Sequence, residues 1–375
     1  MDQPQADGEA VDSTRVSVGC RVVTVAATAR LLLAGQLRGL TDISWSLVCG
    51  DEYLDSPSSL AVHHVPMARE LAPSDLRSLV ELYRFFHRHR FSFVQTHTQK
   101  ASMLGLPAAR CAGLPTLYTM HGCLVFRDNR LIQNILGWVF ERWCCAWAQR
   151  VLVQSREDAE MLPRAKLCRA EKVVFVGNGI TLDRFKGTPL PLSTGEKPVV
   201  MMVSRLVTEK GCRDFFTVAK ALHSKARFVH AGPREVGQRD AISQAELDHL
   251  SSEGFVEFLG PTDDVPGTLA TADLLLHPSY REGIPRVPME AAAMCRPVAG
   301  YDIRGMREVI PAQLGLLVPR GDTSALIRLV ERLLAAPERL EEIGRACREW
   351  VVSRFSEEAV LVRLRAVYAE LGAIG

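Results

Sequence analysis

Short apolar runs alternate along the chain with longer segments in which apolar positions recur every three or four residues. The short runs have the length and β-branched composition of buried strands, and the longer segments have the spacing of amphipathic helices. This alternation predicts an α/β protein with parallel sheets covered on both faces. The predicted strands lie within residues 16–27, 44–49, 93–96, 116–119, 151–154, 173–176, 199–203, 228–231, 256–259, 274–277, 297–300 and 315–318.

Two of the predicted helices carry distinctive side chains. The run over residues 131–147 is rich in tryptophan, but Glu141 and Arg142 interrupt it, so we predict core or interdomain packing for it rather than a membrane span. Residues 75–89 are predicted to place Leu76, Leu79, Leu82, Tyr83 and Phe86 on one apolar face. The other predicted helices cover residues 31–40, 101–112, 212–223, 240–251, 265–271, 287–294, 323–334, 338–352 and 357–371.

The alternation is interrupted once, at residues 186–198 (KGTPLPLSTGEKP), whose Pro, Gly, Ser and Thr content is typical of a linker. This divides the chain into an N-terminal Rossmann-like domain over residues 15–185 and a second one over residues 199–354. A last helix is predicted over residues 355–375. It can pack back on the N-terminal domain. Ligands of such sheets bind beyond the carboxyl ends of the strands, so two facing domains predict a site in the cleft between them.

Composition narrows the function classes. Lys and Arg number 45 and Asp and Glu 43, for a net charge of +2, which argues against a nucleic-acid partner. The ten cysteines show no C-x-x-C spacing, which favours reduced thiols in a cytoplasmic protein and gives zinc no ligand pattern. Residues 1–14 are acidic and polar, unlike a signal peptide.

Residues 203–211 (VSRLVTEKG) leave a predicted strand and open a predicted helix. Backbone N–H groups and the helix dipole make such a turn a ready anion site. Arg205 adds a planar fork and Lys210 a compact charge, and Gly211 would permit close approach of a ligand. Taken alone, the motif favours the alternative that Arg205 and Lys210 are solvated surface charges.

Residues 277–290 (HPSYREGIPRVPME) form a second such turn. Glu282 is predicted in the turn and Glu290 inside the following helix, where their carboxylates can accept hydrogen bonds from sugar or ribose hydroxyls. His121, at the end of a predicted strand, can contact a substrate hydroxyl. Taken singly, each of these residues is more often structural than functional.

Several common motifs are missing from the sequence. It has no D-x-D for a Mg²⁺ clamp, no P-loop, no G-x-G-x-x-G and no G-x-S-x-G. We therefore expect neither a metal nor a cofactor. A negatively charged leaving group would instead be balanced by side-chain cations and helix N-termini.

The order R-x-x-x-x-K-G, then P-S-x-x-E-G-x-P-x-x-x-x-E-A, resembles the retaining glycosyltransferases of family 4, which have the GT-B fold. Residues 177–180 (GNGI) match a further family motif. The stretches VPMAR at 65–69, THTQK at 96–100 and REGIPRVPMEA at 281–291 resemble the subgroup that builds capsular and other bacterial surface polysaccharides. Members of that subgroup often move a hexose or N-acetylhexosamine from a UDP-sugar to a polyprenyl-diphosphate-linked glycan.

The resemblance implies a role for each matched residue. Arg205 and Lys210 would bind the diphosphate, Glu282 and His121 would lie by the donor sugar, and Glu290 would bind the ribose. Configuration would be retained through front-face attack, with the leaving phosphate taking the acceptor's proton. The implied donor-binding positions are Gly211, Gly283, Ile284, Pro285, Arg286, Val287 and Glu290, and the implied acceptor-side positions are Thr28 and Lys100.

The sequence departs from the family pattern at a few positions. Thr181 replaces the usual Asp after N-G-I, and Pro285 removes one N–H that could face phosphate. Cys295 stands where a Gly normally ends the helix. We predict that it either adopts a left-handed backbone, at a cost on the order of 1 kcal/mol, or that the helix ends differently.

We therefore expect a glycosyltransferase that acts on a lipid-linked glycan at the inner face of the cell membrane. The alternative acceptor is a soluble small molecule such as an aminocyclitol; the excess of 37 Arg over 8 Lys hints at a GC-rich genome, where such pathways are frequent. Two further alternatives are a sugar-nucleotide epimerase and a non-catalytic nucleotide-sugar-binding module. Arg77, Arg84, Arg88 and Arg90 on or after one helix indicate contact with an anionic membrane, with a solvated helix face as the alternative.

Overall fold

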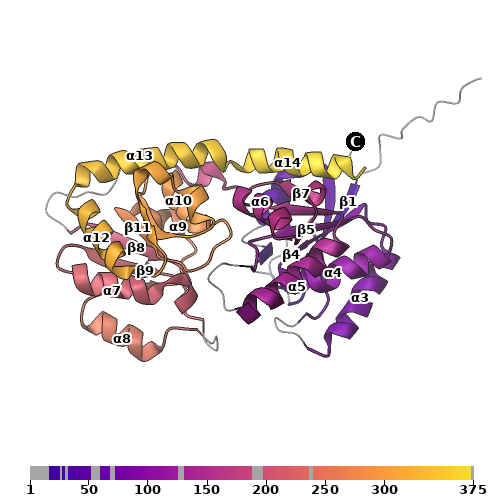
Figure 1. Cartoon of the computed structure of the whole chain (residues 1–375), viewed down its shortest axis with the longest axis horizontal. Helices are drawn as coiled ribbons and strands as arrows, with labels where there is room; N and C mark the ends of the chain where they lie inside the picture. The colour runs from indigo at the N-terminus through magenta and orange to yellow at the C-terminus, as the bar shows by residue number, and fades with distance from the viewer. Residues whose placement is uncertain are drawn as a thin grey trace, which may run out of the picture.

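The computed structural model describes residues 17–25, 28–29, 33–51, 60–67, 72–125, 131–187, 197–235 and 240–372. Two α/β domains lie side by side, and the C-terminal helices run along one side of both (Figure 1). Each domain has one sheet whose strands are all parallel, which confirms the predicted fold class.

In the described part of the N-terminal domain, the sheet has seven strands in the order β3-β2-β1-β4-β5-β6-β7. Its strands are β1 (Ser17–Val23), β2 (Ile43–Cys49), β3 (Ala61–His64), β4 (Phe93–His97), β5 (Thr116–Met120), β6 (Arg150–Val153) and β7 (Val173–Phe175). Its helices are α2 (Ala34–Gly39), α3 (Asp75–Arg88), α4 (Gln99–Cys111), α5 (Leu131–Trp147) and α6 (Arg156–Arg164). The sequence pattern missed β3, a four-residue edge strand without a fully buried side chain.

In the described part of the second domain, the sheet has six strands in the order β10-β9-β8-β11-β12-β13. Its strands are β8 (Val199–Val203), β9 (Arg227–Ala231), β10 (Glu257–Gly260), β11 (Leu274–His277), β12 (Val298–Asp302) and β13 (Leu317–Pro319). Its helices are α7 (Cys212–Leu222), α8 (Gln244–Ser252), α9 (Val265–Ala270), α10 (Arg286–Ala293), α11 (Met306–Val309), α12 (Thr323–Leu334) and α13 (Pro337–Arg354).

The strand order reverses direction between β8 and β11, which are paired through Leu274 and Val200 and through Leu275 and Met201. A crevice forms where loops leave two such neighbouring strands in opposite directions. Both motif loops of the second domain start there, because one follows β8 and the other follows β11. The topology therefore brings together two segments that are about 70 residues apart.

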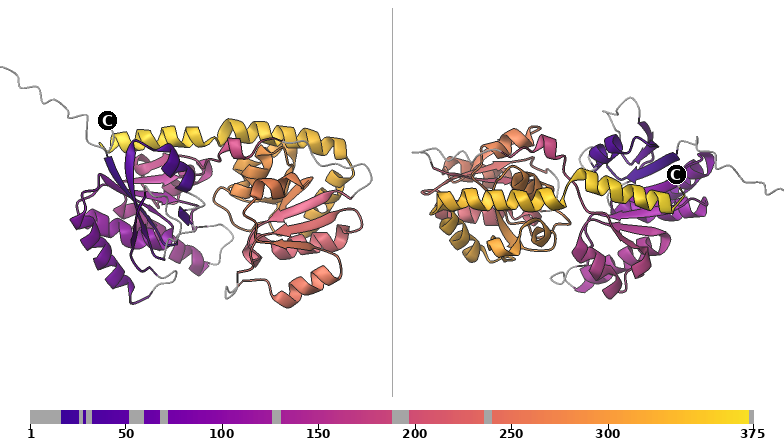
Figure 2. Two further views of the ribbon diagram at one scale, coloured as in Figure 1. Left: turned by 180° about the vertical axis from the view of Figure 1, so that it is seen from behind. Right: turned by 90° about the horizontal axis from the view of Figure 1, so that it is seen from above.

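The last helix, α14 (Glu357–Glu370), leaves the second domain and lies across the N-terminal domain (Figures 1 and 2). Leu364 and Tyr368 are buried there against Trp45 and Phe93 of the first sheet. The crossing point is held by hydrogen bonds, since Thr181 donates to the Glu357 carboxylate at 2.8 Å. This residue replaces the family's usual Asp and here serves the domain junction.

Two predictions about helix faces were wrong in part. On α3, Leu82 and Phe86 are buried, but Leu76 is 70% exposed and Tyr83 is 38% exposed. On α5, Trp138 and Trp143 are exposed, whereas Phe140 and Trp147 are partly buried and pack against the core. The fully buried residues of α5 are small or polar, namely Gly137, Glu141, Cys144 and Cys145.

The prediction for Cys295 is confirmed in its first form. Helix α10 ends at Ala293, and Cys295 has a left-handed backbone with φ of 61°. A cysteine therefore occupies a position that favours glycine, at a cost on the order of 1 kcal/mol.

Candidate active site

The centre of the candidate site is a three-residue cluster in the second domain. Lys210 Nζ lies 2.7 Å from Glu282 Oε1, and His277 Nε2 lies 2.9 Å from the same oxygen. Lys210 ends the short 3₁₀ helix η4 (Thr208–Lys210) after β8, and Glu282 lies in the loop after β11. The reversed strand order is what places the two side chains within reach of each other.

Glu282 is held ionised. Its side chain is only 12% exposed, and burial alone would raise its pKa. The Lys210 ammonium and the hydrogen bond from His277 outweigh burial and hold the pKa of Glu282 at about 2. At neutral pH the carboxylate is therefore a hydrogen-bond acceptor and a weak base.

The role of Gly211 in the structure differs from the prediction that it permits close approach of a ligand. Its φ of 77° is left-handed, and a Cβ there would lie 1.9 Å from the carbonyl oxygen of Pro278. The residue that approaches Gly211 closely is thus part of the neighbouring β11 loop. Glycine lets the two loops pack together at the start of α7.

Arg205 lies apart from this cluster. Its side chain is 44% exposed, and Nη1 lies 3.6 Å from Glu235 Oε1. Glu235 and His277 are the site residues that the motif analysis missed. His277 offered a signal, because it ends a buried strand directly before the Glu282 loop. Glu235 offered none, because its place depends on how a loop after β9 folds.

The helix after Glu282 carries the remaining predicted donor residues. Arg286 Nε lies 3.3 Å from Glu290 Oε1, one helical turn away, and burial raises the pKa of Glu290 although Arg286 opposes the rise. Ile284 is buried and Val287 packs against the core, so their side chains belong to the hydrophobic interior. Pro285 is the N-cap residue of α10, and Arg286 is the first residue of the helix. Because the Ile284 and Val287 side chains face the interior, a ligand here would contact main-chain groups and the Arg286 side chain.

His121 faces this cluster from the N-terminal domain. It follows β5, and together with Gly122, Glu282 and Gly283 it lines an interdomain pocket of about 200 Å³. Its Nε2 lies 3.2 Å from His97 Nδ1. Burial lowers the pKa of His121 to about 4, although a hydrogen bond with Gln154 opposes the shift. The imidazole is therefore neutral near pH 7 and can form hydrogen bonds without adding charge.

The two domains touch directly at this pocket. A Cβ on Gly283 would lie 2.1 Å from the His121 carbonyl oxygen, and a Cβ on Gly122 would lie 3.0 Å from the Gly283 Cα. Both glycines permit an approach of backbone to backbone that other residues would block. The structure thus brings His121, Glu282 and Gly283 together. The motifs had indicated each of them singly and had not predicted this contact.

The acceptor-side predictions have less support. Lys100 is 6% exposed and forms an ion pair with Asp75 between α4 and α3. Thr28 is partly buried, and its amide donates to the carbonyl of Val25. Parts of the predicted strand region 16–27, of the stretch 65–69 and of the linker 186–198 lie outside the described residues. Within the described ranges, no group of three or more His, Cys, Asp or Glu side chains is placed to hold a metal ion, and no helix is long and apolar enough to cross a membrane.

Comparison with known families identifies the class. The model of the glycosyl transferases group 1 matches residues 197–336, and that of the glycosyl transferase 4-like domain matches residues 18–179. Together the two matches cover most of the chain, one in each domain. The chain belongs to the glycosyltransferases of the family 4 type, with the GT-B fold.

Individual relatives are more distant. The chain is 24% identical to the capsular polysaccharide biosynthesis glycosyltransferase CapM of Staphylococcus aureus, over 82% of this chain and 84% of CapM. It is 24% identical to the UDP-Gal:alpha-D-GlcNAc-diphosphoundecaprenol alpha-1,3-galactosyltransferase of Escherichia coli, over 87% and 89%. It is 27% identical to the 2-deoxystreptamine glucosyltransferase of Streptomyces kanamyceticus, over 74% and 77%.

Solved structures share the fold. The crystal structure of Anabaena HepE in complex with UDP and glucose superposes with a TM-score of 0.78 at 19% identity, covering 96% of this chain and all of that one. At this identity the likeness establishes the fold, and the substrates of this chain have to be argued from its own site.

Proposed function

We propose that this glycosyltransferase moves a hexose or N-acetylhexosamine from a UDP-sugar to a polyprenyl-diphosphate-linked glycan, with retention of configuration and without a metal ion. The observation that carries the proposal is the Lys210–Glu282–His277 cluster, which lies opposite His121 across the interdomain pocket. The names of two relatives, the capsular enzyme and the undecaprenol-linked galactosyltransferase, support this acceptor class.

Donor binding would use the cations at this end of the sheet. Lys210 has three N–H donors, and one of them forms a hydrogen bond with Glu282. The other two can bind the diphosphate oxygens. The start of α7 adds backbone N–H groups and its dipole. Arg205 would exchange its long contact with Glu235 for a phosphate oxygen. Positive charge fixed in this way stabilises the leaving UDP in the transition state.

The electrostatics favour front-face attack with retention. Glu282, with its pKa at about 2, is a poor proton acceptor for a hydroxyl group, and the imidazole of His121 is also a weak base. The bond from the anomeric carbon to the phosphate oxygen would break as the acceptor oxygen bonds to that carbon on the same face. The acceptor's proton would pass to the departing phosphate oxygen, so neither side chain needs to act as the base.

A soluble aminocyclitol is the second candidate acceptor, because a 2-deoxystreptamine glucosyltransferase is among the relatives. UDP release measured with a panel of UDP-sugars, against an undecaprenyl-diphosphate-linked sugar and against 2-deoxystreptamine, separates the two. We expect release to depend on the lipid-linked acceptor. Release that depends on the aminocyclitol alone would assign that soluble acceptor instead. A new sugar nucleotide formed without acceptor would indicate an epimerase. UDP binding without any release would indicate a binding module.

The same assay tests the role of Lys210. Lys210→Gln keeps an N–H donor for Glu282 but removes the positive charge, and we expect turnover to fall by about 100-fold or more. Lys220→Gln on α7 is the matched control, because that side chain is exposed and lies outside the cluster. Equal rates for Lys210→Gln and the control would contradict the proposed donor site.

A further inference from the structure

Large exposed apolar side chains are concentrated on one part of the molecule. Of the twelve found among the described residues, ten lie on α3 and α5, both of which pack against α4 in the N-terminal domain. On α3 they are Leu76, Val80 and Tyr83; on α5 they are Leu131, Ile132, Ile135, Leu136, Trp138, Val139 and Trp143.

Helix α5 has the reverse of the usual surface pattern. A surface helix of a globular domain normally turns its polar residues outward. Here the single acidic residue, Glu141, is fully buried, and the outward side presents the stripe Leu131, Ile135 and Val139, which are 77%, 49% and 56% exposed. An exposed apolar face of this length marks an interaction surface.

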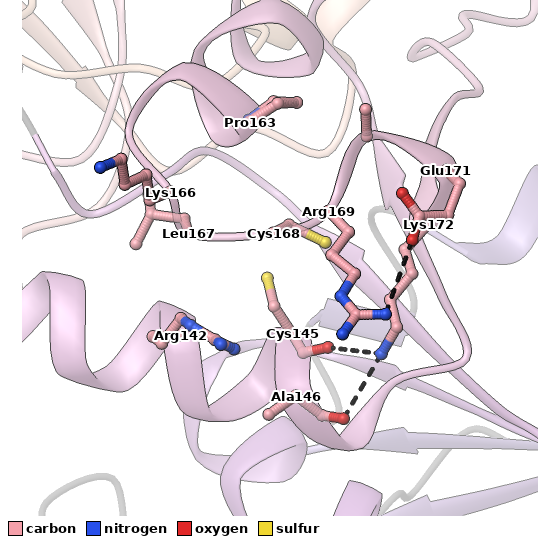
Figure 3. A pocket seen from close by; sticks show the side chains of 11 residues that line it. Arg142, Cys145, Ala146, Pro163, Lys166, Leu167, Cys168, Arg169, Glu171 and Lys172 are labelled. Carbon is pink, nitrogen blue, oxygen red and sulfur yellow. Dashed lines mark hydrogen bonds and ion pairs between the residues drawn. The ribbon is translucent and has the colours of Figure 1, made fainter.

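A basic pocket adjoins this face. It has a volume of about 670 Å³, and Figure 3 shows the side chains of Arg142, Lys166, Arg169 and Lys172 around it, with one carboxylate, Glu171. Arg169 Nη1 lies 3.8 Å from Glu171 Oε1, so four cations face one acid. The Trp138 indole N–H donates to the Ala165 carbonyl at 3.1 Å, which ties the apolar face of α5 to the loop that carries Lys166. The apolar face and the cations therefore form one continuous surface.

The end of α6 places Lys166 at this pocket. Lys166 follows the C-cap residue Ala165, and its left-handed backbone, with φ of 55°, closes the helix through a hydrogen bond from its amide to the Pro163 carbonyl. Its side chain is exposed.

We propose that α5 and this pocket dock the N-terminal domain on a membrane that contains anionic phospholipid. The helix would lie flat in the interface, with its aliphatic side chains and the exposed parts of Trp138 and Trp143 toward the acyl chains and the lipid phosphates in the basic pocket. A lipid surface fits better than a folded protein partner, because the outward side of α5 combines apolar side chains with a cation and carries no acid, and the adjoining pocket has four cations to one carboxylate. The inference rests on this surface alone and holds for either acceptor class.

Docking at α5 would also orient the active site. Leu124 lines the pocket that contains His121, and its amide donates to Glu141 of α5 at 3.1 Å. The membrane face and the active-site loop are thus directly connected.

The test is vesicle flotation of the full chain, without donor or acceptor, so its result is independent of the proposed reaction. We expect the wild type to float with phosphatidylcholine vesicles that contain phosphatidylglycerol, and to float less at high salt. Leu131→Gln, Ile135→Gln and Val139→Gln combined should reduce the bound fraction by about 10-fold or more. The control Leu259→Gln with Val362→Gln, which changes two exposed apolar residues on β10 and α14, should bind like the wild type.

A charge variant provides a second arm. Arg142→Gln, Lys166→Gln and Arg169→Gln combined should weaken binding to the anionic vesicles and abolish its salt dependence. Wild-type flotation by the α5 variant, or no flotation of the wild type with anionic vesicles, would overturn the proposal. Light scattering without lipid tests whether a second copy of the chain binds this face instead. We expect a monomer. A dimer that the α5 variant abolishes would assign this face to a second copy.

Discussion

Glu141 is a carboxyl group sealed inside the N-terminal domain. It accepts hydrogen bonds from the Tyr118 hydroxyl at 2.9 Å and from the Leu124 amide at 3.1 Å. Burial raises its pKa to about 7, although these hydrogen bonds oppose the rise. The contrast with Glu282, whose pKa is about 2 at similar burial, shows that a nearby ammonium group decides the ionisation of a buried carboxyl.

The raised pKa of Glu141 predicts a pH-dependent stability. The folded state binds the proton more tightly than the unfolded state, so this contribution is present below the unfolded pKa near 4.5 and is lost as pH rises through 7. The unfolding free energy of Glu141→Gln relative to that of the wild type should therefore increase between pH 5 and pH 8, by on the order of 2–3 kcal/mol. Urea denaturation across this range checks it with Glu160→Gln as the control, and parallel profiles for all three proteins would contradict it.

Single helices show how far a periodic pattern determines packing. The pattern placed α3, α5 and α14 within a few residues of their observed bounds, because each segment has helical spacing. It could not tell which neighbour covers each helix. The face of α14 that contains Leu364 meets the N-terminal sheet only because the chain crosses between domains at residues 355–356, which pair with Ile180.

The role of α14 predicts a position-dependent loss of stability. Leu364 is 1% exposed within the N-terminal core, whereas Val362 on the same helix is 65% exposed. Leu364→Ala should lower the unfolding free energy of the N-terminal domain by about 2–4 kcal/mol, and Val362→Ala should change it by less than about 0.5 kcal/mol. Denaturant titration followed by tryptophan fluorescence is the measurement, because four of the five tryptophans lie in the N-terminal domain and only Trp350 lies in the second. A similar small loss for both variants would mean that α14 does not stabilise this domain.

The two domains are closed on each other by a buried ion pair. Arg304 of the second domain lies 2.6 Å from Asp158 on α6, and its other guanidinium nitrogen donates to the Val125 carbonyl at 2.9 Å. The pocket of about 200 Å³ between His121 and Glu282 is smaller than the range of about 300–1,000 Å³ usual for small-molecule sites. We therefore expect the domains to separate when a nucleotide sugar enters, and the Arg304–Asp158 pair to break as they do.

Asp158→Asn tests this closure. It leaves the buried guanidinium without its charge partner, which disfavours the closed state by several kcal/mol, whereas domain opening would return Arg304 to water. We expect the radius of gyration from X-ray scattering to increase in the absence of UDP. Glu157→Gln is the control, because its pair with Arg307 is 41% and 44% exposed and contributes at most about 1 kcal/mol. Identical scattering from both variants would show that Arg304 does not hold the domains closed.

Local sequence by itself determined the α/β alternation and the order of the motif loops, because each follows from neighbouring residues. Tertiary structure alone decided that Lys210 pairs with Glu282 and His277, that Gly211 faces Pro278, and that Trp138 and Trp143 of α5 are exposed while Trp147 packs against the core. These contacts join segments far apart in the chain, and a periodic pattern states that a face is apolar without stating what covers it. The physical reason is that contact partners depend on strand order and domain closure, which no short stretch of residues contains.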